Sequence, residues 1–277
     1  MSILKGNLSS DYLNGEFQKS LKDEEKILDR TSGFKRLDEC QIMSPGLYLI
    51  SGESGSGKST FVGQLVEQML DNNPHECVIY VTYDLTEEDV YYKSLTRYIY
   101  QSNPQKAIKE SQLQNHADDP VLLDAAAQLG DRSPLMFVME FPGEKEQLFE
   151  QLYKAINEFK EIDPLIYSPI VVIDPIQGVP YKDNISEKNN VYQILYMITE
   201  FQHKTNSTVF VVSYQDDNNP FEDAATVEWV VRCKTDNSRH STFVLKNKKA
   251  RGGIEGYTLH YDYYYTYNTF VEKAEED

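Results

Sequence analysis

The sequence predicts an α/β fold, with a mostly parallel central sheet flanked by helices and antiparallel strands at the C-terminal end. From residue 46 to residue 214, short apolar runs alternate with amphipathic helical segments, as in parallel strands joined by crossover helices. The runs at 228–233 and 241–247 have no helical segment between them, which indicates antiparallel neighbours. Of the 277 residues, 40% are hydrophobic and 26% charged, which is typical of a globular chain with a sizeable core.

Each predicted strand is a short run of apolar, β-prone residues bounded by polar or glycine-containing segments. The tyrosine-rich segment 261–268 is interpreted as an edge strand, because tyrosine favours strands, rather than as a surface for stacking nucleobases. The other predicted strands are 46–51, 77–83, 134–140, 169–174, 208–214, 228–233 and 241–247.

Helical periodicity predicts the elements between these strands. The clearest case is 145–161, where the apolar residues share one helical face. A further helix is expected from Ser186, which can cap its N-terminus, to about Lys204. The remaining predicted helical segments are 61–70, about 90–100 and 122–130.

Residues 1–43 are polar and charge-rich, and we interpret them as an N-terminal helical arm ahead of a single domain at 44–277. Leu13, Phe17 and Leu21 follow one another at a spacing of four, which predicts one apolar helical stripe. The stripe can pack on the arm's own core or dock on a neighbouring subunit, and the pattern favours neither. No internal repeat or long linker divides the rest of the chain.

Charge and cysteine content exclude several classes of protein. Lys and Arg number 27 against 44 Asp and Glu, and the net charge of −17 argues against a broad basic surface such as that of a nucleic-acid coat. The three cysteines are far apart, which excludes a disulfide scaffold and a CxxC zinc site. No apolar run approaches the length of a membrane span, and the N-terminus lacks the pattern of a secretory signal. We therefore expect a cytoplasmic protein without a membrane partner.

The segment between the first predicted strand and the first predicted helix fits the phosphate-loop pattern G-x-x-x-x-G-K-[ST] at every fixed position. Glycines let backbone N–H groups curl around phosphate oxygens, Lys58 supplies positive charge to the β- and γ-phosphates, and the Ser59 hydroxyl can ligate Mg²⁺. The pattern predicts a site for ATP. Its expected phosphate-binding residues are Gly52, Glu53, Ser54, Gly55, Ser56, Gly57, Lys58, Ser59 and Thr60.

A carboxylate for the metal is expected at Asp174, which ends the apolar strand 169–174. The carboxyl ends of parallel strands meet at one edge of the sheet, so Asp174 is expected beside the phosphate loop. From there it can hold Mg²⁺ directly or through water. A strand-ending aspartate that only caps the turn before Pro175 is the alternative.

Several stretches together resemble the RecA-type ATPases of the DnaB/KaiC group, and most closely the ATPase domain of DnaB-type replicative helicases. The resemblance covers about residues 31–260, and the order and spacing of the stretches carry it. They are Thr31-Ser32-Gly33-Phe34-x-x-Leu37-Asp38, Pro45-Gly46-Leu47, the phosphate loop, VIYVTYDLT (78–86), VVIDPIQ (171–177) with Gln177, VFVVSYQ (209–215) and FVLKNKKARGGIEG (243–256).

The resemblance implies further catalytic residues. Asp84 stands where the family has the glutamate that polarises the attacking water, with Glu88 nearby as a substitute; a helix N-terminal acid without a chemical role is the alternative. Gln215 is implied as the sensor of the γ-phosphate, although Tyr214 separates it from Ser213. The family's trans-acting finger falls in the basic stretch 246–251, where its arginine position lies near Lys248 and the nearest arginine is Arg251.

The implied function is an ATP-hydrolysing motor on single-stranded DNA, assembled head to tail as a hexameric ring or a filament of identical subunits. A different class stays open: a KaiC-like nucleotide-dependent switch or assembly ATPase that binds a protein partner and does not unwind DNA. The net charge and the aspartate at the glutamate position favour this alternative. So does the region 177–194, which carries acidic as well as basic residues and is a poor DNA-binding loop.

Overall fold

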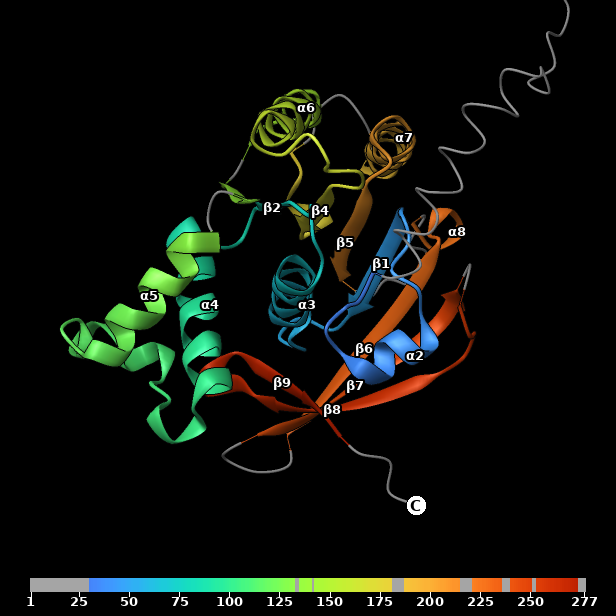
Figure 1. Ribbon diagram of the computed structural model, residues 1–277. Coiled ribbons are helices and arrows are strands. Elements are labelled where there is room, and N and C mark those ends of the chain that lie inside the picture. The colour runs from blue at the N-terminus through green and yellow to red at the C-terminus, as the bar shows by residue number, and fades with distance from the viewer. Residues whose placement is uncertain are drawn as a thin grey trace, which may run out of the picture.

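The computed structural model describes residues 30–132, 135–140, 142–180, 187–214, 221–235, 240–250 and 253–273. Its centre is a nine-stranded sheet in the order β3-β2-β4-β5-β1-β6-β7-β8-β9 (Figure 1). The first six strands in this order run parallel, and β7, β8 and β9 continue the sheet antiparallel. The predicted fold class is confirmed. The strands are β1 (Gly46–Gly52), β2 (Val78–Thr82), β3 (Met136–Glu140), β4 (Ile170–Asp174), β5 (Thr208–Tyr214), β6 (Val227–Thr235), β7 (Ser241–Ala250), β8 (Thr258–Tyr264) and β9 (Thr269–Glu272).

Helices cover both faces of the parallel part, as crossover connections require. Figure 1 shows α6 and α7 together on one face and α3 on the other, with α4 and α5 outside the β3 end of the sheet. Short 3₁₀ turns occur at Pro104–Lys106, Glu110–His116, Ile176–Gly178 and Tyr265–Tyr267. The helices are α2 (Lys35–Cys40), α3 (Lys58–Asn72), α4 (Glu87–Ser102), α5 (Pro120–Arg132), α6 (Lys145–Ile162), α7 (Glu187–Thr205) and α8 (Phe221–Ala224).

Two apolar cores lie on opposite faces of the sheet because strand side chains alternate. Tyr48 and Ile50 of β1 join the core under α3, whereas Leu47 and Leu49 join the core under α6 and α7. Phe61, in the first turns of α3, is fully buried and its ring lies 5.0 Å from that of Phe243. The aromatic packing fixes α3, and with it the loop that precedes this helix, against the sheet.

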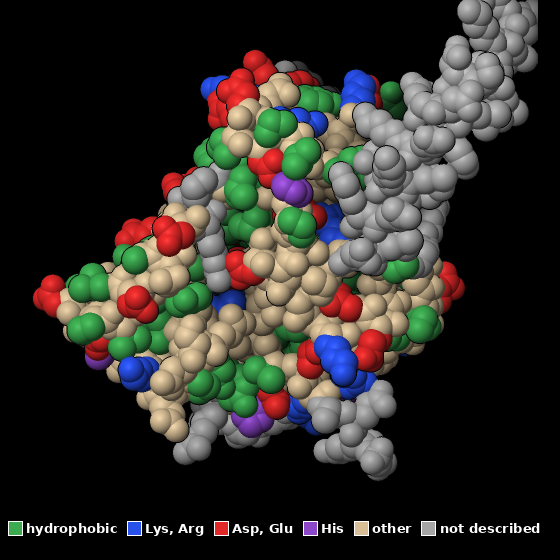
Figure 2. Space-filling model, viewed as in Figure 1, with side chains coloured by type: hydrophobic (Ala, Val, Ile, Leu, Met, Phe, Trp, Pro, Cys, Tyr) green, Lys and Arg blue, Asp and Glu red, His purple; other side chains and the backbone are tan. Residues whose placement is uncertain are grey.

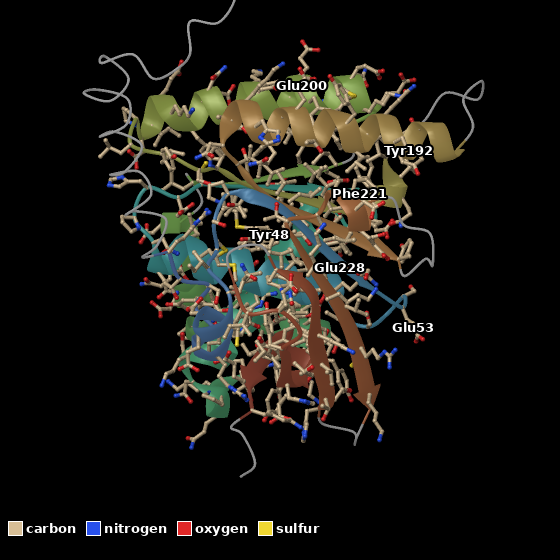
Figure 3. All side chains as sticks on the ribbon, turned by 90° about the vertical axis from the view of Figure 1, so that its right-hand side faces the viewer. Tyr48, Glu53, Tyr192, Glu200, Phe221 and Glu228 are labelled. Atoms are coloured by element: carbon tan, nitrogen blue, oxygen red, sulfur yellow. The ribbon has the colours of Figure 1, made fainter. Side chains whose placement is uncertain are left out.

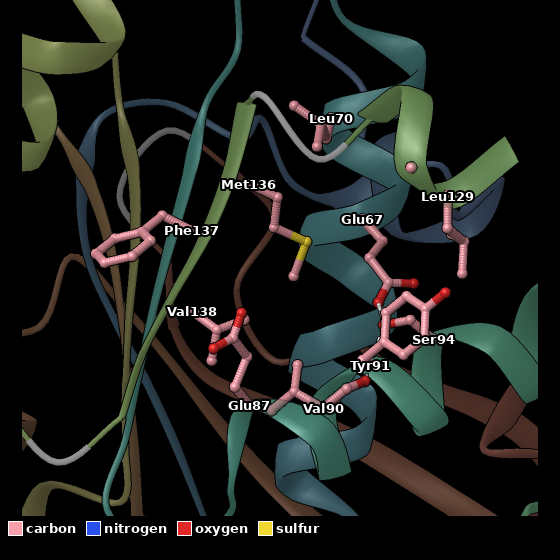
Figure 4. Close-up of a pocket in the computed structure, with 11 residues that line it drawn as sticks. Glu67, Leu70, Glu87, Val90, Tyr91, Ser94, Leu129, Met136, Phe137 and Val138 are labelled. Atoms are coloured by element: carbon pink, nitrogen blue, oxygen red, sulfur yellow. Dashed lines mark hydrogen bonds between the residues drawn. The ribbon is translucent and has the colours of Figure 1, made fainter. Parts of the chain in front are cut away.

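A third, smaller core joins α4 to α5. Where α4 meets α3, a buried ion pair joins Arg97 Nη1 to Glu67 Oε2 at 2.5 Å, and the Ser94 hydroxyl donates to the same glutamate. An apolar pocket of about 170 Å³ lies between α3, α4 and β3, with Glu67 and Tyr91 on its helical side and Phe137 on the strand (Figure 4). The pocket shares no residue with the loop between β1 and α3.

Two segments differ from their sequence-based interpretation. The tyrosine-rich segment is not an edge strand: β8 pairs with both β7 and β9, because the chain turns back at Tyr265–Tyr267. Residues 30–43, which we assigned to the N-terminal arm, pack on the core under α3 through Phe34, Leu37 and Met43. Residues 1–29, with the predicted apolar stripe, lie outside the described residues. In the part of the chain that the structure describes, no helix is long and apolar enough to cross a membrane.

Candidate nucleotide site

The loop between β1 and α3 depends on glycines at two points. Gly52 ends β1 so close to β6 that a Cβ would lie 2.5 Å from the carbonyl oxygen of Val231. Gly57 caps α3 in the left-handed conformation, with φ of +90°, which glycine adopts without steric cost. Glu53 projects outward from this loop (Figure 3). The loop therefore follows the backbone course for which the phosphate-loop pattern selects.

Lys58, the first residue of α3, folds back over this loop. Its Nζ donates to the carbonyl oxygens of Gly52 at 2.9 Å and Glu53 at 2.7 Å. The residue is buried, with a relative exposure of 5%. Burial lowers the pKa of Lys58, and the nearby Asp174 carboxylate partly opposes this shift. The ammonium group is thus held at the mouth of the loop, inside the turn that phosphates would enter.

The N-terminus of α3 is built for an anion. Its capping residue is glycine, which offers no side-chain oxygen to the first-turn N–H groups, and no acidic residue lies in that turn. The Ser56 hydroxyl is buried without a hydrogen-bond partner in the part of the chain described. Helix N–H groups without a capping side chain, the Ser56 hydroxyl and a lysine together match the donor set that phosphate oxygens require.

Asp174, at the end of β4, lies beside the start of α3. Its Oδ1 accepts from the Ser59 hydroxyl at 3.0 Å, and its Oδ2 accepts from Tyr80 at 2.6 Å. Only 3% of its surface is exposed, and this burial raises the pKa of Asp174, although the two hydroxyl donors lower it and the Asp84 charge raises it further. Hydroxyl and carboxylate oxygens side by side are the ligand chemistry that Mg²⁺ prefers, so these residues fit the metal.

Asp84 and Glu88, the two carboxylates implied for the attacking water, are placed differently. Asp84 follows β2, and its Oδ2 accepts from the Tyr214 hydroxyl at 3.0 Å. The Tyr214 ring in turn lies 5.4 Å from Lys58 Nζ. Glu88 lies on the exposed first turn of α4 and accepts from Tyr92 on the same helix. Contacts among described residues therefore connect Asp84, but not Glu88, to Lys58.

The remaining implied residues are only partly described. Gln215 and Arg251 lie outside the described residues. Within the basic stretch 246–251, Lys248 pairs with Glu228 at 2.9 Å, and Lys249 donates to the carbonyl oxygens of Glu222 and Asp223. Glu228 pairs in register with Leu49, the middle residue of β1, so these lysines lie level with the middle of that strand and not at the end that leads into the phosphate loop.

Sequence reasoning missed two side chains at the site. Tyr80 lies inside the run 77–83, which predicts a strand, and the structure shows that its hydroxyl reaches Asp174. Tyr214 was noted only as a residue between Ser213 and Gln215. A buried tyrosine usually finds a partner for its hydroxyl, and this rule was the available signal for Tyr80. No pattern in the sequence indicates that Tyr214 and Asp84 meet.

A glycine-rich loop that leads from a parallel strand into a helix, with a lysine in its mouth and an aspartate on a neighbouring strand, defines the class of P-loop nucleotide-binding proteins. The sequence model of the family described as "ATPase: KaiC" matches residues 31–236, which is more than half of the chain. The protein therefore belongs to the KaiC ATPase family and is a P-loop ATPase. No curated protein matches this sequence.

Solved structures share the fold at low sequence identity. One solved ATPase domain has a TM-score of 0.77 at 15% identity, covering 97% of this chain and 100% of that chain. A DnaB-like replicative helicase, studied with its interactions with primase, has a TM-score of 0.73 at 16% identity, covering 95% of this chain and 66% of that chain. A KaiC-like protein from Pyrococcus horikoshii OT3 has a TM-score of 0.61 at 13% identity, with 88% and 98% covered. The predicted resemblance to RecA-type ATPases of the DnaB/KaiC group is confirmed.

Substitution of Gly57 by alanine is expected to lower the free energy of unfolding by about 1–2 kcal/mol, the cost of the left-handed conformation for a residue with a Cβ. The new Cβ would also lie 3.2 Å from the Tyr263 ring. Denaturant unfolding measures the loss. The matched control is Gly63→Ala on the same helix, where the Cβ meets nothing closer than 3.7 Å, and we expect no loss there. Equal stability of Gly57→Ala and wild type would contradict the described loop.

Proposed function

We propose that this protein binds ATP with Mg²⁺ at the loop between β1 and α3 and hydrolyses it. The observation that carries the proposal is the meeting of Lys58, Ser59 and Asp174 at an uncapped helix N-terminus. Lys58 and the loop N–H groups bind the phosphates, and Ser59 and Asp174 hold Mg²⁺. When bound, Mg²⁺ neutralises charge on the phosphate oxygens.

For the attacking water, the contacts favour Asp84 over Glu88. Asp84 is connected to Lys58 through Tyr214, whereas Glu88 is engaged with Tyr92 on the exposed side of α4. We assign Asp84 the role of orienting the water and accepting its proton, a step that typically contributes about 10²- to 10⁴-fold to the rate. Gln215, the residue after Tyr214, is proposed to respond to the γ-phosphate.

We also propose that identical subunits assemble head to tail, as a hexameric ring or a filament, and share each site. The location of the basic stretch supports this arrangement, because Lys248 and Lys249 lie level with the middle of β1 rather than at the strand end that leads into their own phosphate loop. A cation from this stretch is therefore better placed for a neighbour's site than for its own. Since both lysines have partners within the subunit, Arg251 is the proposed finger.

The proposed use of ATP is movement on single-stranded DNA, supported by the likeness of the fold to that of a DnaB-like replicative helicase. A second candidate, a KaiC-like switch that binds a protein partner, is favoured by the family match and by the net charge of −17. On the face in Figure 2, acidic groups gather over the upper and left parts, and Lys and Arg form small separate groups. A contact with DNA on this face would be local.

ATP turnover measured with and without single-stranded DNA separates the two candidates. A motor is expected to hydrolyse ATP at least severalfold faster with DNA at low salt, and the stimulation is expected to fall steeply as salt rises, because phosphate contacts release counterions. The mass of the assembly in ATP is measured alongside. A ring or filament without DNA stimulation or DNA binding at low salt would exclude the motor and leave the switch.

A further inference from the structure

Tyr214 occupies a special position at the carboxyl edge of the sheet. It is the last residue of β5 and pairs in register with Gly52, the first residue of the phosphate-loop pattern. Its side chain is 37% exposed, in contrast to the rest of its strand, which is buried. An aromatic residue that is neither core nor fully solvated, directly beside the phosphate loop, requires an explanation from its contacts.

Among the described residues, the hydroxyl of this side chain contacts one charged group and its ring contacts another. The hydroxyl donates to Asp84 Oδ2 at 3.0 Å, and Lys58 Nζ lies 5.4 Å from the centroid of the ring. The two partners come from different elements, since Asp84 follows β2 and Lys58 begins α3. A cation near an aromatic face and a carboxylate at a phenol hydroxyl are both favourable arrangements. Tyr214 therefore connects two oppositely charged side chains that the strand order keeps apart.

The backbone of Tyr214 is also held from the neighbouring strand end. Its N–H donates to Gln177 Oε1 at 3.4 Å, and Gln177 Nε2 donates to the Ser213 hydroxyl at 2.8 Å. The Ser213 side chain is fully buried and donates to the carbonyl oxygen of Tyr214 at 3.0 Å. Gln177 lies in the short 3₁₀ turn after β4, three residues beyond Asp174. The ends of β2, β4 and β5 are thus joined through one tyrosine.

We propose that Tyr214 is a positioning residue for ATP hydrolysis: its hydroxyl orients Asp84, and its ring keeps Lys58 at the mouth of the phosphate loop. The inference rests on the proposed hydrolysis and adds the residue that sets the relative placement of base and lysine. A general base must lie within hydrogen-bond reach of the water, and small displacements of catalytic groups cost large factors in rate. The contacts of Tyr214 with both Asp84 and Lys58 support this role.

The test compares Tyr214→Phe with Tyr214→Ala. Phenylalanine retains the ring but not the hydroxyl, so kcat is expected to fall about tenfold with KM for ATP within about twofold of wild type. Alanine removes both contacts, so we expect a larger loss of kcat than with phenylalanine and also a higher KM, because Lys58 is no longer held by the ring. A phenylalanine variant that recovers KM and only part of kcat relative to alanine would assign the ring to Lys58 and the hydroxyl to Asp84. The matched control is Tyr196→Phe on α7, whose side chain is 69% exposed, and we expect no change in either constant.

A mutant cycle with Asp84→Asn isolates the contact. If Tyr214 acts through Asp84, the double variant with Tyr214→Phe is expected to have the kcat of Asp84→Asn alone. Independent, multiplicative losses would overturn the proposal, and so would a Tyr214→Phe variant within about twofold of wild type in kcat. If wild type does not turn over ATP, the proposed hydrolysis fails and the role of Tyr214 fails with it. If wild type turns over ATP and Tyr214→Phe is unaffected, only the role of Tyr214 fails. A melting temperature of Tyr214→Phe equal to that of wild type identifies the effect as one on catalysis rather than folding.

Discussion

Replacement of Lys58 by alanine is expected to lower kcat for ATP by about 10²- to 10³-fold or more, the usual effect of deleting one preorganised charge from a transition-state site. The ammonium lies inside the loop, within hydrogen-bond distance of the Gly52 and Glu53 carbonyl oxygens. Steady-state turnover and binding of a fluorescent ATP analogue measure the loss.

Lys145 provides the matched control for this variant. Its relative exposure, 7%, is close to that of Lys58, but its Nζ is bonded to Asn190 and Gln193 between α6 and α7. Lys145→Ala removes an equally buried lysine outside the loop, so we expect a loss of stability with little change in ATP turnover. Normal turnover by Lys58→Ala would show that the phosphates bind elsewhere.

Replacement of Asp174 by asparagine is expected to abolish Mg²⁺-dependent turnover and, at neutral pH and without Mg²⁺, to raise the melting temperature. Burial raises the pKa of this carboxyl, so ionisation costs the folded state more than the unfolded chain. The folded state therefore has its full free energy of unfolding at low pH, where Asp174 is protonated. Part of this free energy is lost as the pH rises through the raised pKa of Asp174. Asparagine is neutral at every pH, and the Ser59 and Tyr80 hydroxyls can rotate to pair with its amide.

Calorimetric unfolding of wild type and Asp174→Asn between about pH 4 and pH 8 tests this prediction. For a chain of this size, a change of about 1 kcal/mol in the free energy of unfolding shifts the melting temperature by about 2–4 °C. The control is Asp163→Asn, because a hydrogen bond from His75 lowers the pKa of Asp163. This control is expected to leave turnover unchanged and not to raise the melting temperature. Intact Mg²⁺-dependent turnover of Asp174→Asn would contradict the metal role. A melting temperature below that of wild type would contradict the cost of ionising the buried carboxyl.

Features that depend on neighbouring residues could be predicted from the sequence. The phosphate loop is contiguous, so Gly52, Gly57, Lys58 and Ser59 are recognisable from their spacing alone. The strand at 169–174 is an apolar run whose end places Asp174 at the loop-bearing edge of any parallel sheet. The alternation of apolar runs and amphipathic segments was enough for the α/β class. In each case the information lies within a short stretch of consecutive residues, where periodicity and turn chemistry act.

Contacts between distant segments needed the tertiary structure. Tyr214 and Asp84 are 130 residues apart in the sequence. They meet because Asp84 follows β2, Tyr214 ends β5, and only β4 separates these two strands in the sheet. The return of the chain after Tyr264, which makes β9 rather than β8 the edge, has no periodic signal. The partners of Lys248 and Lys249 depend on the same long-range pairing. Sequence alone determined the class of nucleotide-binding fold and the phosphate loop. Strand order and register, which arise from packing across the whole sheet, decided which side chains surround that loop.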